Sequence, residues 1–144
     1  MAVDPETGGI EILDYVVAED AGVLVNPMIV DGQIQGGTAQ GIGSALFEEM
    51  PFDTRGQPLA STLADYLLPG CVEVPSMRIL HMETPSPYTE LGQKGVGEGG
   101  AIGPAAAIAN AVNDALAPLA VELCEIPITP ARVLAALSKA RTAG

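Results

Sequence analysis

Residues 91–100 place five glycines around a single carboxylate, that of Glu98. Glycines this dense let the backbone approach a ligand closely or adopt dihedral angles that a side chain would forbid. A carboxylate in such a loop is a candidate general base, because it can take up a proton beside a reacting group. The structural alternative is an acidic residue at the positive end of the Ala-rich helix expected after it, and the pattern alone favours this alternative.

The same glycines match, in form, the Gly-x-Gly-x-x-Gly fingerprint of dinucleotide-binding proteins. Residues 95–100 carry the glycines, and Glu122 follows at about the expected distance. That motif must come directly after a strand, because the tight turn delivers the pyrophosphate to a helix N-terminus. Here the preceding strand is expected to end near Met82, and Pro85 and Pro87 intervene. The sequence therefore argues against a nicotinamide or flavin site.

A second group of candidate residues lies on a helix that is predicted to begin at Asn26 and Pro27. Asn is a good N-cap, and Pro is preorganised for the first helical position. Small and apolar residues then recur at helical spacing: Val30, Ile34, Thr38, Gly41 and Ala45. Each glycine inside an exposed helix costs up to about 1 kcal/mol. This helix contains Gly36, Gly37, Gly41 and Gly43. We therefore expect another backbone or a ligand to lie against this helix. For Gln40 the pattern alone indicates only a polar residue on the solvated side of the helix.

The remaining pattern mixes separate helices and strands, which predicts an α+β fold in a single domain over residues 1–144. Strands are expected within residues 10–18 and 77–82, and a hairpin turn at 53–56. Beyond the helix at Pro27, helices are expected at 63–68, at 102–116 and from 129–130 onwards. The core-facing residues of the last two are expected to be Ile102, Ala105, Ala109, Val112, Leu116, Val133, Leu134 and Leu137.

Composition excludes several classes of function. Six basic residues against 18 acidic ones give a net charge of −12, so binding to nucleic acid or to an anionic membrane surface is not expected. Cys71 and Cys124 are isolated, which suits a reducing cytoplasm, with one bridge as the alternative. His81 is the only histidine, and no spacing favours a protein metal site. Neither a membrane span nor a secretory signal is expected.

Short motifs follow one another along almost the whole chain. In the first half they are Asp4-Pro5-Glu6-Thr7-Gly8, Asp20-Ala21-Gly22, Val25-Asn26-Pro27, Gly32-Gln33-Ile34, Gly36-Gly37-Thr38-Ala39-Gln40-Gly41-Ile42-Gly43, Glu48-Glu49 and Asp65-Tyr66. In the second half they are Glu83-Thr84-Pro85-Ser86-Pro87, Lys94-Gly95-Val96-Gly97-Glu98, Ala109-Asn110-Ala111-Val112-Asn113-Asp114-Ala115 and Pro127-Ile128-Thr129-Pro130. In this order they resemble the C-terminal part of the molybdopterin-binding large subunit of the xanthine dehydrogenase family. Aerobic carbon monoxide dehydrogenase-like and aldehyde oxidase-like members look most similar.

The resemblance implies roles for particular residues. Glu98 matches the family's active-site base, which takes a proton from a hydroxide on molybdenum that attacks an electrophilic carbon of the substrate. Gln40 matches a position that faces the pterin, and Gly41 would let the cofactor approach the helix. Lys94, Gly95 and Gly97 belong to the motif of the base and are expected to contribute to cofactor binding. The structural alternative for Lys94 is a pairing with a nearby carboxylate.

Family large subunits are several times longer than this chain, and their upstream half supplies other pterin contacts and much of the substrate pocket. The resemblance therefore implies a fragment or one piece of a split subunit, inactive alone and able to self-associate through an uncovered face. It would share a molybdenum–molybdopterin cofactor, in the cytosine dinucleotide form, with the missing segment. Iron–sulfur and flavin subunits or domains are the other expected partners. Family members that act on carbon monoxide, aldehydes or N-heterocycles share this C-terminal pattern, so the resemblance does not identify the substrate. The alternative function is a non-catalytic scaffold or assembly module that retains the fold.

Overall fold

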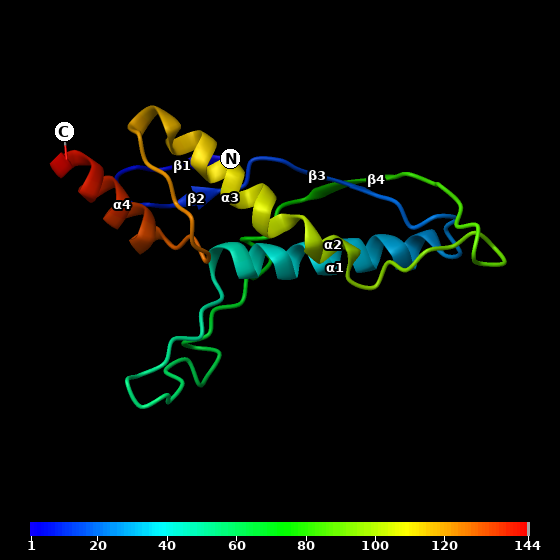
Figure 1. The fold of residues 1–144 in the computed structure, drawn as a ribbon, viewed down its shortest axis with the longest axis horizontal. Helices are drawn as coiled ribbons and strands as arrows, with labels where there is room; N and C mark the ends of the chain where they lie inside the picture. Colours follow the sequence, from blue (N-terminus) through cyan, green and yellow to red (C-terminus); the bar gives the residue numbers. More distant parts are fainter. Residues whose placement is uncertain (144) are drawn as a thin grey trace.

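The structure is a computed structural model that describes residues 1–143, and a single long helix runs along its length (Figure 1). This helix, α1, spans Pro27–Leu46. The Asn26 side chain accepts a hydrogen bond from the backbone nitrogen of Ile29 at 3.3 Å, and Pro27 opens the first turn. The predicted helix start is therefore confirmed. The other helices are α2 (Gly99–Ile102), α3 (Pro104–Leu116), the 3-10 helix η1 (Ala117–Leu119) and α4 (Pro130–Ala143).

The strands form two small, separate sheets. β1 (Ala2–Val3) and β2 (Ile10–Glu11) pair antiparallel near the N-terminus. β3 (Tyr15–Glu19) and β4 (Met77–His81) pair in parallel over five residues each, alongside α1 (Figure 1). The mixture of helices and short strands confirms the predicted α+β class. The strand expected within residues 10–18 is divided into β2 and β3, because the chain leaves one sheet and enters the other between them.

Glycines allow α2 and the start of α3 to lie directly on α1. A Cβ at Gly37 would come within 2.9 Å of the backbone nitrogen of Ala101, and a Cβ at Gly41 within 2.6 Å of the Pro104 ring. A Cβ at Gly100 would overlap the backbone of Ile34. The expectation that another backbone lies against this helix is confirmed at Gly37, whereas at Gly41 the neighbour is the side-chain ring of Pro104.

Replacing Gly100 with alanine is expected to destabilise the fold. The added methyl group would meet the Ile34 backbone, which cannot rotate away as a flexible side chain can, and such overpacking typically costs about 1–3 kcal/mol. Urea unfolding of the variant should show the loss. Gly32→Ala is the matched control, because nothing lies within 4 Å of its Cβ position on α1. Equal stability of the two variants would contradict the described packing.

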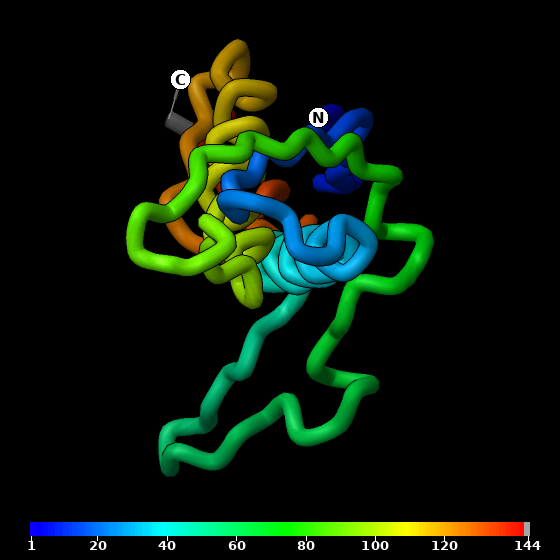
Figure 2. Tube along the Cα trace, turned by 90° about the vertical axis from the view of Figure 1, so that its right-hand side faces the viewer, coloured from blue at the N-terminus to red at the C-terminus, as the bar shows by residue number. Residues whose placement is uncertain are grey.

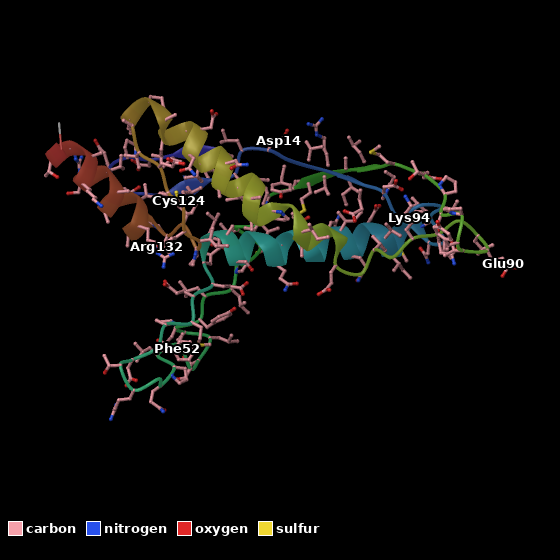
Figure 3. All side chains as sticks on the ribbon, in the orientation of Figure 1. Asp14, Phe52, Glu90, Lys94, Cys124 and Arg132 are labelled. Carbon is pink, nitrogen blue, oxygen red and sulfur yellow. The ribbon has the colours of Figure 1, made fainter. Side chains whose placement is uncertain are left out.

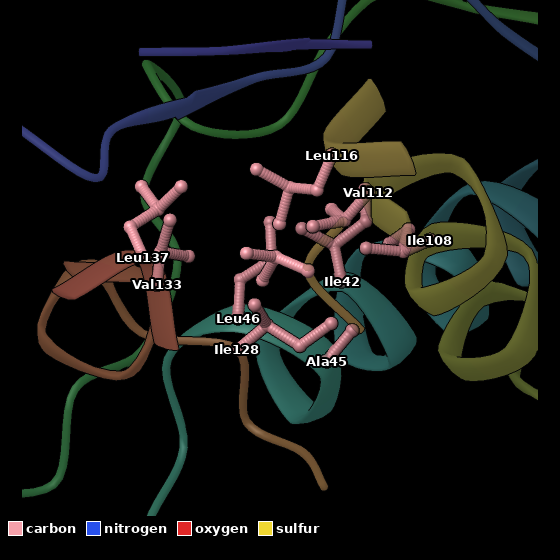
Figure 4. Close-up of a cluster of buried hydrophobic side chains, with 10 residues drawn as sticks. Ile42, Ala45, Leu46, Ile108, Val112, Leu116, Ile128, Val133 and Leu137 are labelled. Carbon is pink, nitrogen blue, oxygen red and sulfur yellow. The ribbon is translucent and has the colours of Figure 1, made fainter. Parts of the chain in front are cut away.

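The main core lies where the C-terminal half of α1 meets α3 and α4 (Figure 4). Its largest fully buried side chains are Ile42, Ile108, Val112, Leu116, Ile128 and Val133. The predicted core positions Val112, Leu116, Val133 and Leu137 are thus buried, and Leu134 is partly buried. Ile102 is wrong as a core position, because 82% of it is exposed. It ends α2, and α3 starts afresh at Pro104, so one helical period does not run through both.

A smaller cluster lies under the glycine-rich segment, residues 91–100, near the N-terminal half of α1. It consists of the buried residues Ala21, Val30 and Ile34, and Val96 packs against it. Val96 therefore holds the glycine-rich segment to the β3 side of α1 through a short apolar contact.

Residues 48–76 form an arm that extends away from the helices (Figure 2). The predicted turn is confirmed, because Asp53 accepts hydrogen bonds from the backbone nitrogens of Arg55 and Gln57 at 2.8 and 2.9 Å. The predicted helix at 63–68 is wrong: the chain turns there, and the backbone nitrogen of Tyr66 donates to the Thr62 carbonyl at 2.8 Å. Leu63, Leu67 and Leu68 are each more than half exposed, so no tertiary packing stabilises a short helix here. Phe52 likewise lies on the arm, 61% exposed (Figure 3).

Among residues 1–143, no helix combines the length and the apolar character needed to cross a bilayer.

Candidate functional site

Glu98 occupies the N-cap position of α2, with its side chain exposed to solvent. This is where the structural alternative places it, yet the carboxylate makes no hydrogen bond to the helix amides. Within residues 1–143 the carboxylate also makes no ion pair. The group is therefore available to accept a proton or a hydrogen bond from outside the described residues.

Gly95 and Gly97 stand immediately before Glu98, and both are exposed. Nothing lies within 4 Å of the position where a Cβ would be in either residue. Neither has a positive φ, in contrast to Gly92, whose φ is 76°. Neither packing nor backbone conformation within the described residues therefore requires a glycine at these two positions.

Helix α1 carries the segment that leads to Glu98. The Gln33 side chain donates a hydrogen bond to the carbonyl oxygen of Gly97 at 3.2 Å, and the buried Thr38 hydroxyl donates to the carbonyl oxygen of Gly100 at 3.3 Å. Gln40 follows Gln33 by seven residues, so it lies on the same side of α1 about 10 Å further along. The structure thus brings the exposed Gln40 side chain and residues 94–100, the Glu98 segment, to one side of α1.

Gly41 is buried, and the Pro104 ring occupies the space beside it. Its contact with α3 accounts for this glycine within the chain, and the approach of a cofactor to it stays a prediction. Gly36 differs, because it is exposed with nothing within 4 Å of its Cβ position.

Lys94 is bound by the residues that follow the two parallel strands. Its Nζ lies 2.9 Å from Asp20 Oδ2 and 2.5 Å from Thr84 Oγ1, and the Thr84 hydroxyl donates to the same carboxylate. The alternative of a pairing with a carboxylate is therefore confirmed for Lys94. The Thr84 hydroxyl, followed by the Lys94 ammonium, holds the pKa of the Asp20 carboxyl well below its usual value. Lys94 and Glu90 lie at the end of the molecule opposite Cys124 and Arg132 (Figure 3).

Replacing Asp20 with asparagine is expected to flatten the pH dependence of stability in acid. Because folding lowers the pKa of Asp20, its stabilising effect is present above its unfolded pKa of about 4 and is lost as the pH falls further. Urea unfolding midpoints measured from pH 7 to pH 2 should therefore keep a constant gap between wild type and Asp20→Asn above about pH 4, and the gap should narrow below it. Asp114→Asn, an exposed substitution, serves as the control. A constant gap between the two curves across this range would refute the pairing.

The only histidine serves as a link between β4 and α1. His81 Nε2 lies 2.7 Å from Asp31 Oδ1, while its Nδ1 is buried without a partner in the described residues. Within this part of the chain, no three or more His, Cys, Asp or Glu side chains gather in a way that could hold a metal ion. Cys71 and Cys124 are both free and exposed.

A hollow of about 440 Å³ separates β3 from α2 and the start of α3. The successive residues of β3 line one side, and Gly99, Gly100 and Pro104 line another. β3 pairs with β4 along one edge only, so its second edge is open in the described residues.

A family model described as the molybdopterin cofactor-binding domain matches residues 1–75, more than half of the 144 residues. The chain belongs to this family. The resemblance to the molybdenum-binding subunits of the xanthine dehydrogenase family is thereby confirmed.

The relatives of this molybdopterin-binding domain are much longer proteins. It is 46% identical over 134 residues to the nicotine 6-hydroxylase large subunit of Paenarthrobacter nicotinovorans, covering 93% of this chain and 16% of the relative. It is 39% identical over 137 residues to the carbon monoxide dehydrogenase large chain of Hydrogenophaga pseudoflava, covering 95% of this chain and 17% of the relative. The solved structure of quinoline 2-oxidoreductase from Pseudomonas putida 86 superposes with a TM-score of 0.92 at 47% identity. The match covers 95% of this chain and 17% of that structure's chain. The chain therefore spans about a sixth of these relatives' length.

Sequence reasoning did not single out three polar residues that hold this molybdopterin-binding domain together near Glu98. Gln33, Asp20 and Thr84 all lie in the motifs that carry the family resemblance. The contacts of Gln33 with Gly97 and of Asp20 with Thr84 and Lys94, however, join residues that are 64 to 74 positions apart in the chain. The motifs indicated that these positions matter, and only the fold identifies what they bind.

Proposed function

We propose that this chain contributes the general base, Glu98, and part of the molybdopterin site of a molybdenum hydroxylase. One observation carries the proposal: in a molybdopterin-binding domain, a carboxylate without a partner follows two glycines that the described residues do not require. Open space beside Gly95 and Gly97 is what a bulky cofactor and a substrate would need next to a base.

Each residue has a role in this proposal. Glu98 accepts the proton that is released when the substrate is hydroxylated, and Gln40 offers its amide to the pterin. Gly95 and Gly97 leave room for the cofactor. Gly41 and Lys94 support the site from within the chain, through their contacts with Pro104 and Asp20. The bound cofactor, proposed from the resemblance to be the cytosine dinucleotide form, supplies the two-electron oxidation.

The proposal requires a second segment, because a base of this kind works best when shielded from water and Glu98 is exposed. We propose that the upstream part of a large subunit covers this side and pairs with the open edge of β3. Uncovered apolar residues such as Ile102 and Leu80, 82% and 56% exposed, agree with a missing cover. Iron–sulfur and flavin subunits are the further partners proposed, and two exposed free cysteines agree with assembly in the cytoplasm.

The experiment is to assemble the chain with the upstream part of a large subunit and to measure molybdenum and pterin per complex. Gln40→Ala should reduce the cofactor content, because it removes the proposed amide contact. Gln35→Ala is the control: it changes an exposed glutamine of the same helix that makes no hydrogen bond within the described residues. An assembly that forms with no molybdenum at all would favour the scaffold function instead.

A further inference from the structure

We propose that Gln33 and Lys94 are positioning residues, which hold the Glu98 segment in place from two sides. The inference rests on the proposed function of Glu98 as the base. Gln33 acts next to the base itself: its Nε2 donates to the carbonyl of Gly97 at 3.2 Å. That carbonyl belongs to the peptide unit whose nitrogen is that of Glu98, so this hydrogen bond fixes the plane from which the Glu98 side chain departs.

Lys94 holds the start of the segment through both its side chain and its main chain. The side chain binds Asp20 and Thr84, and the backbone nitrogen donates to the carbonyl of Ala21 at 2.8 Å. Asp20 is itself fixed, because it accepts backbone hydrogen bonds from Gly22 at 3.0 Å and from Thr84 at 3.2 Å. The start of the segment is thus tied to the chain ends of both β3 and β4.

The residues between these two anchors cannot hold the base by themselves. Gly95 and Gly97 have no side chain and lose more conformational freedom on ordering than any other residue. Val96 supplies one apolar contact, with the cluster around Ile34. After Glu98, Gly100 lies against Ile34, and the carbonyl of Glu98 accepts a hydrogen bond from the Ala101 nitrogen at 3.0 Å. On the other side of the base, the Gly97 carbonyl is bound by the Gln33 side chain.

Positioning of this kind affects the rate, because a general base must be within hydrogen-bond reach of the proton that it removes. Displacements of about 1 Å in an active site cost up to about a hundredfold in rate. Loss of the Gln33 hydrogen bond is therefore expected to lower kcat about ten- to a hundredfold, with little change in KM.

The test uses the assembled, cofactor-loaded enzyme and compares Gln33→Leu with Gln35→Leu. We expect Gln33→Leu to lower kcat and to leave the molybdenum content unchanged. It should also accelerate amide hydrogen exchange about fivefold at Ala101, whose nitrogen donates to the carbonyl of Glu98 at 3.0 Å. Gln35→Leu should match wild type in every measurement. Gln33→Lys, which retains a donor for the Gly97 carbonyl, should recover most of kcat. Unchanged exchange, or faster exchange with an unchanged kcat, would overturn the role of Gln33.

Lys94 is tested in the same assembly with Lys94→Met and Lys94→Arg. The methionine variant should lower kcat and accelerate exchange at residues 94–97, and the arginine variant should recover part of both. Loss of molybdenum or pterin in Lys94→Met would assign Lys94 to the cofactor and overturn its positioning role.

Glu98→Gln separates the two proposals. If this variant is active, the proposed function fails. If it is inactive while Gln33→Leu and Lys94→Met are unimpaired, only the positioning inference fails.

Discussion

Replacing Glu98 with glutamine is expected to lower kcat of the assembled enzyme by about a hundred- to ten-thousandfold, the usual range for a lost general base. Glutamine cannot take up the proton, so the rate should fall. Because it has nearly the same shape as glutamate, the molybdenum content should not change. Because the Glu98 carboxylate makes no hydrogen bond or ion pair within residues 1–143, its removal leaves no partner unpaired in this chain. Steady-state kinetics normalised to molybdenum measure the effect.

Glu90→Gln is the matched control for this experiment. Glu90 is an exposed carboxylate of the same irregular stretch, eight residues earlier, and no role is proposed for it. Its variant should keep wild-type activity. Full activity of Glu98→Gln would mean that another group is the base, and loss of molybdenum from this variant would mean that Glu98 binds the cofactor instead.

Replacing Ile34 with alanine is expected to destabilise the fold by about 2–5 kcal/mol, the usual cost of truncating a fully buried isoleucine. Ile34 is 0% exposed, and it packs with Ala21 and Val30 beneath Val96. Its own backbone also supports Gly100. The loss should therefore appear both in urea unfolding and as faster amide exchange in the glycine-rich segment.

Ile29→Ala provides the comparison, because Ile29 lies on the same helix with 57% of its surface exposed. Its truncation should change the free energy of unfolding by no more than about 0.5 kcal/mol. If Ile34→Ala is as mild as this control, the small cluster does not support the Glu98 segment as described.

Where a signal is local, the sequence predicts the fold well. Asn26 and Pro27 define the start of α1 within two residues, and the period of three and four finds the buried side of α3 from Val112 to Leu116. The predictions at residues 63–68 and at Ile102 are wrong for different reasons. Ile102 ends α2, and α3 starts afresh at Pro104, so Ile102 lies outside the helical period of α3. The leucines of residues 63–68 have no element within residues 1–143 to pack against. Apolar residues at helical spacing predict burial only if another element is there to cover them, and that depends on the whole fold.

The candidate site shows the same division. Glycine density indicated that something approaches residues 36–43 and 95–100, but only the structure separates two kinds of glycine. Gly37, Gly41 and Gly100 are required by helix packing, whereas Gly36, Gly95 and Gly97 face open space. The pattern alone favoured an acidic residue at the positive end of the following helix for Glu98, and the family resemblance favoured a base. The structure places Glu98 at the N-cap position of α2 without a capping hydrogen bond, and its role as the base stays a proposal.

The most direct test of the central claim is the molybdenum content of the chain purified alone and after assembly with the upstream part of a large subunit. We expect no bound molybdenum or pterin for the chain alone and about one of each per assembled complex, since Glu98 and Gln40 are exposed on this chain and need a second segment to enclose the cofactor. Stoichiometric cofactor on the isolated chain, or a stable assembly without any, would contradict this expectation.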